Sequence, residues 1–156
     1  MSKNNLKDTL THLCAVCGEK SKGEYKVASL LKEHQIKFEK EKTFKDCIFQ
    51  DSKANARFDF FVDDKYIIEV DGQHHYFPIK YGSNISDDQA KILYEKVLEH
   101  DRYKNEYCFI HNIPIIRIPY ISIKDLTYED LMVDKSKFLL YNNIEKGRNF
   151  IITNEE

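Results

Sequence analysis

Apolar and polar residues along the middle of the chain follow a pattern that predicts paired strands. Residues 57–62 and 66–70 are rich in aromatic and β-branched side chains, and Asp63-Asp64-Lys65 between them has the composition of a tight turn. Because the connection is so short, we expect these two runs to form an antiparallel hairpin. Residues 43–49 and 113–119 are two further strand-like runs.

Helical periodicity flanks these strands. Ser21 and Glu24 form a capping-box pattern ahead of an amphipathic stretch, which predicts a helix over about residues 21–35. Residues 86–111 predict a long helix with Ser86 as its N-cap. Residues 122–141 favour one or two C-terminal helices, and residues 150–152 are compatible with an edge strand.

The order helix, three strands, long helix, strand, helix favours a mixed α/β architecture, in which helices flank a mixed sheet. At 156 residues the chain is long enough for one domain but hardly for two. We expect a polar N-terminal arm over residues 1–20, a single folded domain over 21–141 and a C-terminal tail over 142–156.

Composition narrows the protein class but leaves its function open. Hydrophobic residues make up 42% and charged residues 32% of the chain, as in a folded globular protein. Neither a membrane-spanning apolar run nor a signal-peptide core is present, so we expect a cytoplasmic protein without a membrane partner. The net charge of −2 counts against a purely electrostatic DNA binder, although a nuclease needs carboxylates for its metal site.

Four cysteines are present, and a cytosolic chain is not expected to pair them in disulfides. Cys14 and Cys17 have the spacing of half a zinc site, but no second pair completes the four ligands that structural Zn²⁺ requires. His12 and His34 are conceivable extra ligands that nothing in the sequence specifies. An unliganded turn, the remnant of a zinc knuckle and a zinc ion shared between two chains are the alternatives.

Three acidic residues occupy strand positions where apolar residues are expected. Asp59 lies between two phenylalanines, and Glu69 and Asp71 end the following strand on one face. The hairpin should bring Asp59 near Glu69. Clustered carboxylates repel one another unless a cation lies between them, and oxygen ligands suit Mg²⁺, or Mn²⁺ in its place. These three residues therefore predict a metal site that could activate water and polarise a phosphate.

Histidines and helix residues near these carboxylates are further candidates. His74 or His75, just after Gly72, could act as a general base, although turn histidines are usually ordinary surface residues. Asp101 and Lys104 share a face of the long helix, where a solvated ion pair is the plainer interpretation. Glu24 is explained equally well by its capping role.

These residues, in this order, resemble the PD-(D/E)XK nuclease superfamily. The similarity is greatest to the branch of very-short-patch repair endonucleases and phage and bacterial EDxHD homing endonucleases, and it covers about residues 23–120. It rests on an ordered set of motifs: Phe58-Asp59-Phe60, Ile68-Glu69-Val70-Asp71-Gly72-x-x-His75, Asp101-x-x-Lys104 and Ile115-Ile116-Arg117-Ile118-Pro119.

The resemblance implies a restriction-endonuclease-like core, with a four-stranded mixed sheet between helices. It also implies Mg²⁺-dependent hydrolysis of double-stranded DNA that leaves 5′-phosphate and 3′-hydroxyl ends. The implied roles are those of an acidic residue on the first helix, a metal-binding aspartate, the acids that end the third strand, the motif histidine and its final aspartate. Glu24 corresponds to the acid on the first helix, Asp59 to the metal-binding aspartate, and Glu69 and Asp71 to the acids that end the third strand. His75 corresponds to the motif histidine and Asp101 to the final aspartate.

The chain departs from the superfamily pattern at one position. Asp71 stands where a lysine is expected, and Lys104 or His75 could replace that lysine. The departure leaves two alternatives to a homing-type endonuclease: a decayed nuclease fold that only binds DNA or another partner, and a nickase for mismatched or branched DNA. A long target site would require a homodimer or another partner.

Overall fold

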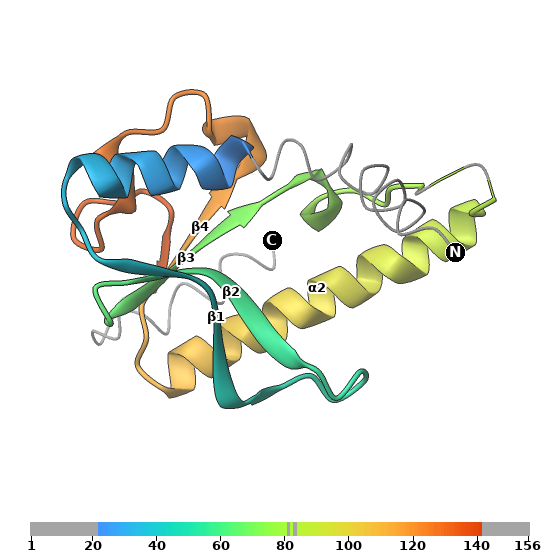
Figure 1. Cartoon of the computed structure of the whole chain (residues 1–156). Helices are drawn as coiled ribbons and strands as arrows, with labels where there is room; N and C mark the ends of the chain where they lie inside the picture. The colour runs from blue at the N-terminus through green and yellow to red at the C-terminus, as the bar shows by residue number, and fades with distance from the viewer. Residues whose placement is uncertain (1–21, 81, 83, 142–156) are drawn as a thin grey trace, which may run out of the picture.

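A five-stranded mixed sheet in the order β1-β2-β3-β4-β5 runs through the centre of the molecule (Figure 1). The computed structural model describes residues 22–80, 82 and 84–141. β3 and β4 are parallel, and every other neighbouring pair is antiparallel. The strands are β1 (Phe38–Ile48), β2 (Asn55–Val62), β3 (Tyr66–Asp71), β4 (Ile115–Pro119) and β5 (Leu139–Tyr141).

The predicted hairpin is confirmed as β2 and β3. Phe60 pairs with Ile68 and Val62 with Tyr66 across an antiparallel ladder. Asp63 and Asp64 both have φ of 52°, the left-handed conformation that short hairpin turns require and that aspartate tolerates better than most residues. The turn therefore sets the register that places Asp59 across from Glu69.

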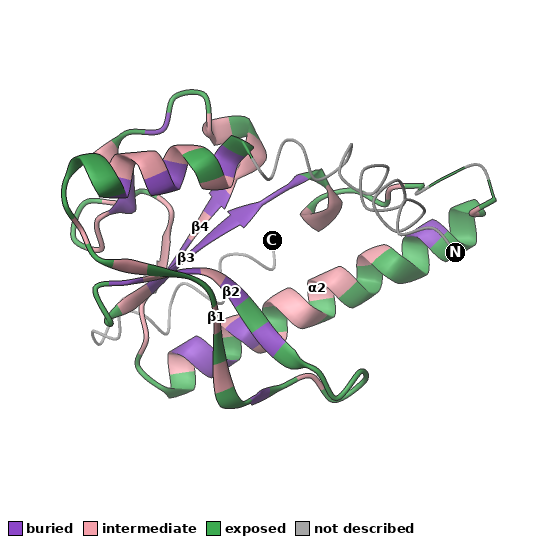
Figure 2. Ribbon diagram, in the orientation of Figure 1, coloured by how far each residue is buried: buried purple, intermediate pink, exposed green. Residues whose placement is uncertain are grey.

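Helices cover both faces of this sheet. A helix over residues 22–33 packs on one face, where Val27 and Leu31 contact Phe60 and other core residues. α2 (Asp87–Ile110) covers the other face, where Tyr107 packs with Phe58 and others. Figure 2 shows that burial on α2 is concentrated in its C-terminal half. None of the described helices is long and apolar enough to cross a membrane.

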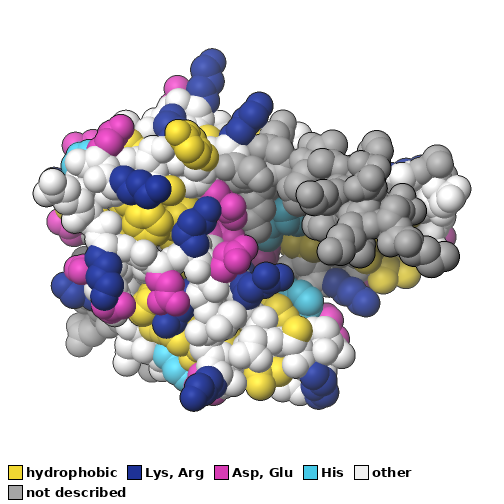
Figure 3. Space-filling view, viewed as in Figure 1, with side chains coloured by type: hydrophobic (Ala, Val, Ile, Leu, Met, Phe, Trp, Pro, Cys, Tyr) yellow, Lys and Arg dark blue, Asp and Glu magenta, His cyan; other side chains and the backbone are white. Residues whose placement is uncertain are grey.

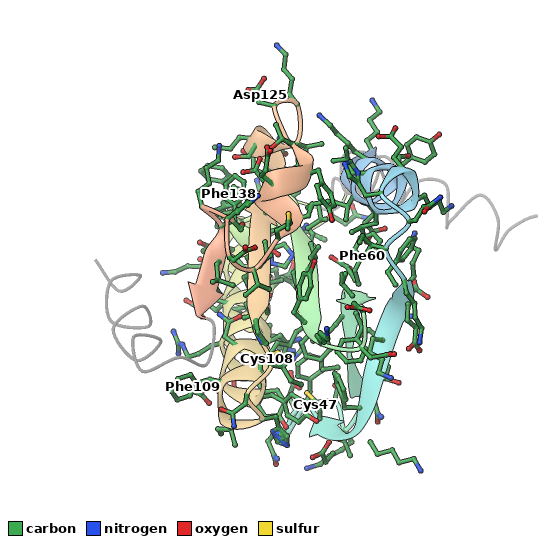
Figure 4. All side chains as sticks on the ribbon, turned by 90° about the vertical axis from the view of Figure 1, so that its left-hand side faces the viewer. Cys47, Phe60, Cys108, Phe109, Asp125 and Phe138 are labelled. Carbon is green, nitrogen blue, oxygen red and sulfur yellow. The ribbon has the colours of Figure 1, made fainter. Side chains whose placement is uncertain are left out.

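β2 changes layers along its length. Ala56 and Phe58 belong to the core beneath α2, whereas Phe60 and Val62 belong to the core beneath the helix of residues 22–33. Figure 4 shows the same division, with Phe60 near that helix and Cys47 near Cys108, which belongs to α2. Asp59 lies at the point where the strand passes from one layer to the other.

The C-terminal part of the domain differs from the expectation. In place of the helices expected over 122–141, the chain forms two single turns, η2 (Tyr120–Ser122) and η3 (Tyr128–Leu131), and then β5. Buried Leu126 and Leu131 hold this segment against the core, and Met132 is already extended. Tertiary burial overrides helical spacing here, and β5 makes the sheet five-stranded rather than four-stranded.

Two expectations lie outside the described residues. They are the half zinc site, with Cys14, Cys17 and His12, and the edge strand of residues 150–152, together with the arm and tail to which they belong. Cys47 and Cys108, which are described, are buried.

Candidate active site

Asp59 and Glu69 face each other across the β2–β3 hairpin. The Asp59 main-chain N–H donates to Glu69 Oε1 at 3.2 Å, and the Val70 N–H donates to Asp59 Oδ2 at 2.8 Å. Each carboxylate is therefore fixed by the main chain of the opposite strand. Glu69 is only 1% exposed, and burial, with a contribution from Asp59, raises its pKa above the ordinary value.

Lys104 reaches this pair from α2. Its Nζ lies 2.9 Å from Glu69 Oε1 and 4.9 Å from the centre of the Phe58 ring. Lys104 is 9% exposed, so its aliphatic chain and its charge are both enclosed. The solvated ion pair with Asp101 is the wrong interpretation of this helix face: it points into the protein, and Lys104 is the cationic partner of Glu69.

Asp71 has a different cationic partner, Arg117. Arg117 lies opposite Glu69 in the parallel β3–β4 ladder, and its Nη1 donates to Asp71 Oδ1 at 2.8 Å. Its Nε donates to Asn105 Oδ1 on α2 at 2.8 Å. Burial opposes the Arg117 charge, but Asp71, Asp101 and Glu69 together raise the pKa of the guanidinium. The sequence motif included Arg117 without giving it a role, although a charged residue between Ile116 and Ile118 is the same signal that singled out Asp59.

His75 completes the group. Its Nδ1 lies 2.6 Å from Asp101 Oδ2 and 3.9 Å from Asp71 Oδ1. Burial would raise the pKa of Asp101, but Arg117 and the His75 hydrogen bond together hold it below the ordinary value. Ionised Asp101 can only accept, so His75 Nδ1 carries the proton in this hydrogen bond. The Nε2 of a neutral His75 ring is therefore left with a lone pair.

Two candidates lie beside this group rather than within it. Gly23 contacts the end of β3, since a Cβ added there would lie 2.7 Å from Val70 Cγ1. Glu24 is thus at the same end of the sheet, but within the described chain no hydrogen bond or ion pair joins it to the site carboxylates. His74 lines a small apolar cavity with Phe77 and others, so His75 is the histidine of the site.

An open cleft of about 460 Å³ borders the histidine side of the group. Asp71, His75, Asp101 and Arg117 line it together with Asn105. Its other walls are aromatic, aliphatic or basic, and are formed by Tyr76, Pro119, Lys137, Phe138, Leu139 and Leu140. A reacting group that enters this cleft would meet the imidazole and both charge signs.

The donor chemistry of the site suits a hard divalent cation, but no metal cage is assembled. Within the described part of the chain, Asp59, Glu69, Asp71 and Asp101 lie with the permanent cations Lys104 and Arg117, and these six side chains carry a formal charge of −2. Among the described residues, however, no three His, Cys, Asp or Glu side chains are grouped as metal ligands. Lys104 contacts Glu69 at Oε1 and Arg117 contacts Asp71 at Oδ1, so a metal would bind these carboxylates through their other oxygens.

Comparison with protein-family models, curated proteins and solved structures finds no match for this chain. Functional inference therefore rests on the geometry of the site.

Proposed function

We propose that this protein is a metal-dependent endonuclease that hydrolyses phosphodiester bonds in double-stranded DNA. One observation carries the proposal: residues from β2, β3 and α2, singled out separately in the sequence, lie together at one end of the sheet beside an open cleft. Their chemistry combines oxygen ligands, a paired histidine and a buried lysine. Such groups can serve metal-assisted phosphodiester hydrolysis: oxygen ligands hold the metal ion, and a positioned histidine transfers a proton.

His75, Asp101 and Lys104 have different roles in the proposed hydrolysis. His75 Nε2 accepts a proton from the attacking water as the oxygen–phosphorus bond forms, and Asp101 stabilises the imidazolium that results. The bond from phosphorus to the 3′ oxygen then breaks, and that oxygen takes a proton from solvent water to leave a 3′-hydroxyl. The hydroxide so formed takes up the proton held by His75. Lys104 supplies positive charge near the phosphate, in place of the lysine that position 71 lacks.

Mg²⁺, with Mn²⁺ as its substitute, would be held by Asp59 and Glu69, the two carboxylates that the hairpin places side by side. When bound, the ion supplies Lewis acidity to the phosphate and lowers the pKa of the attacking water.

On the face of the molecule that Figure 3 shows, a duplex would meet basic and acidic side chains together. Figure 3 shows lysine and arginine side chains mixed with acidic ones over the face in view, as expected for a net charge of −2. Lys137 lines the cleft itself and can contact a backbone phosphate there.

Replacing Asp59 by asparagine tests the proposal directly. Asp59→Asn keeps the side-chain volume but removes a charge from the proposed metal pair, so plasmid nicking in Mg²⁺ should fall by about 100-fold or more. Asp63→Asn in the exposed hairpin turn is the matched control and should cut normally. Full activity of Asp59→Asn, or full activity of the unaltered protein in EDTA, would refute the proposal.

A specific observation favours the alternative of a decayed nuclease that only binds DNA. Lys104 and Arg117 neutralise Glu69 and Asp71 internally, as a purely structural network would. Binding of duplex DNA with no cleavage of perfect, mismatched or branched substrates in any divalent ion would support this alternative. Preferential cutting of one strand of mismatched or branched DNA would instead identify a nickase.

A further inference from the structure

Arg117 connects several side chains on the histidine side of the site to one another. Its guanidinium contacts three groups from two other elements: the Asp71 carboxylate on β3, the Asp101 carboxylate on α2 at 3.5 Å and the Asn105 amide on α2. Its side chain is 9% exposed. A buried guanidinium with several planar contacts is a rigid connector, because its donors have fixed relative directions.

His75 and Arg117 contact different oxygens of the Asp101 carboxylate. Oδ2 accepts the short hydrogen bond from His75, whereas Oδ1 faces Arg117. Arg117 Nη2 also donates to the Asp101 main-chain carbonyl at 3.4 Å. The carboxylate that orients the imidazole is thus held from its other side by Arg117, and Asp71, the second carboxylate near His75, is held by the same nitrogen.

We infer that Arg117 is the positioning residue of this site: it holds Asp101 and Asp71 where they fix the orientation of the His75 ring. The inference rests on the proposed nuclease function for its consequence, but its structural content is independent of catalysis. Arg117 contacts no substrate in this role, and it acts only through the two carboxylates. The rival interpretation is that Arg117 merely fastens α2 to the sheet through Asn105.

The first measurement does not depend on activity. The proton in a hydrogen bond as short as that between His75 Nδ1 and Asp101 resonates at low field, and its signal is assigned by its loss in His75→Gln. In Arg117→Gln this signal should disappear or move upfield. In Tyr107→Phe, which removes a hydrogen bond fastening α2 to β1, it should persist.

The second measurement uses cleavage. The single-turnover rate of Arg117→Gln should fall by about 100-fold, the effect of a misplaced catalytic group, while its affinity for duplex DNA stays unchanged. Arg57→Gln removes an exposed positive charge from β2 and controls for charge loss alone. Arg117→Lys keeps the charge but cannot make the three contacts together, so its rate and its signal should be intermediate.

Each outcome decides one question. An unchanged low-field signal in Arg117→Gln refutes the positioning role whether or not the protein cuts DNA. If Arg117→Gln does not fold, an Arg117→Lys variant equal to the unaltered protein in both signal and rate refutes it instead. If the unaltered protein cuts no DNA, the proposed function fails, and the signal still decides how His75 is held.

Discussion

At the scale of single residues, the site is a set of carboxylates that cross-strand hydrogen bonds and two buried cations hold in place. Glu69 pairs with Lys104 and Asp71 with Arg117, so each acid on β3 has a partner on a different element. The aspartate at position 71 does not leave the site without positive charge. Lys104 on α2 and Arg117 on β4 supply positive charge beside β3, the strand on which a lysine was expected.

The Glu69–Lys104 pair predicts a pH-dependent loss of stability. Glu69 is 1% exposed, and Lys104→Met removes its nearest cation. At neutral pH the free energy of unfolding should fall by about 3–5 kcal/mol, the usual result of breaking a buried pair. Burial already raises the folded-state pKa of Glu69 above the ordinary value of 4.5, and removing Lys104, which lowers it, raises it further; the loss therefore grows as the pH rises through these folded-state values.

Urea unfolding across that pH range measures the effect. Below pH 4.5 Glu69 is protonated in both states, so the variant should lie closest to the unaltered protein there. Lys104→Met/Glu69→Gln should recover part of the loss at neutral pH, since no buried charge remains. Lys96→Met, at an exposed position of α2, is the control. A pH-independent loss in Lys104→Met would show that packing against Phe58 is what matters.

At the scale of elements, the helix of residues 22–33 packs against β3, the strand that carries Glu69 and Asp71. Gly23 lies against Val70, between the two acids of β3 in sequence, and against Ile123. Gly23→Ala would place a methyl group 2.7 Å from Val70 Cγ1. We expect overpacking to destabilise the fold by about 1–3 kcal/mol, and the displacement of β3 to reduce cleavage as well.

Thermal unfolding and plasmid nicking of Gly23→Ala test this packing. Lys32→Ala, at an exposed position of the same helix, should change neither. A Gly23→Ala variant as stable and active as the unaltered protein would mean that the helix can shift away from β3 at no cost.

Sequence patterns predicted the elements whose signals are local. Strand alternation and the Asp63-Asp64 turn located the hairpin, and Ser86 located the start of α2. Residues 122–141 were predicted wrongly because buried Leu126 and Leu131, not helical spacing, set their conformation. The role of Arg117 could not be read locally either, since its partner Asp71 is 46 residues away in sequence and adjacent only through the parallel ladder.

At the scale of the whole molecule, the β2–β3 hairpin and α2 bring several acidic side chains together in a protein that is otherwise nearly neutral. The net charge is −2 over 156 residues, and the six described side chains Asp59, Glu69, Asp71, Asp101, Lys104 and Arg117 together carry a formal −2. Such a concentration of charge disfavours the folded state, and a divalent cation would relieve it. Metal binding and stability should therefore be linked.

The resulting prediction is that Mg²⁺ raises the thermal stability of the protein. A ligand that binds only the folded state adds about 2.7 kcal/mol at a concentration 100 times its dissociation constant. The unfolding temperature should rise with Mg²⁺ and with Mn²⁺ but not with the same ionic strength of NaCl. Asp59→Asn should abolish the rise, whereas Asp125→Asn, at an exposed position outside the proposed site (Figure 4), should retain it. If Asp59→Asn responds to Mg²⁺ as the unaltered protein does, the ion binds elsewhere, and the proposed pairing of Asp59 with Glu69 as metal ligands is wrong.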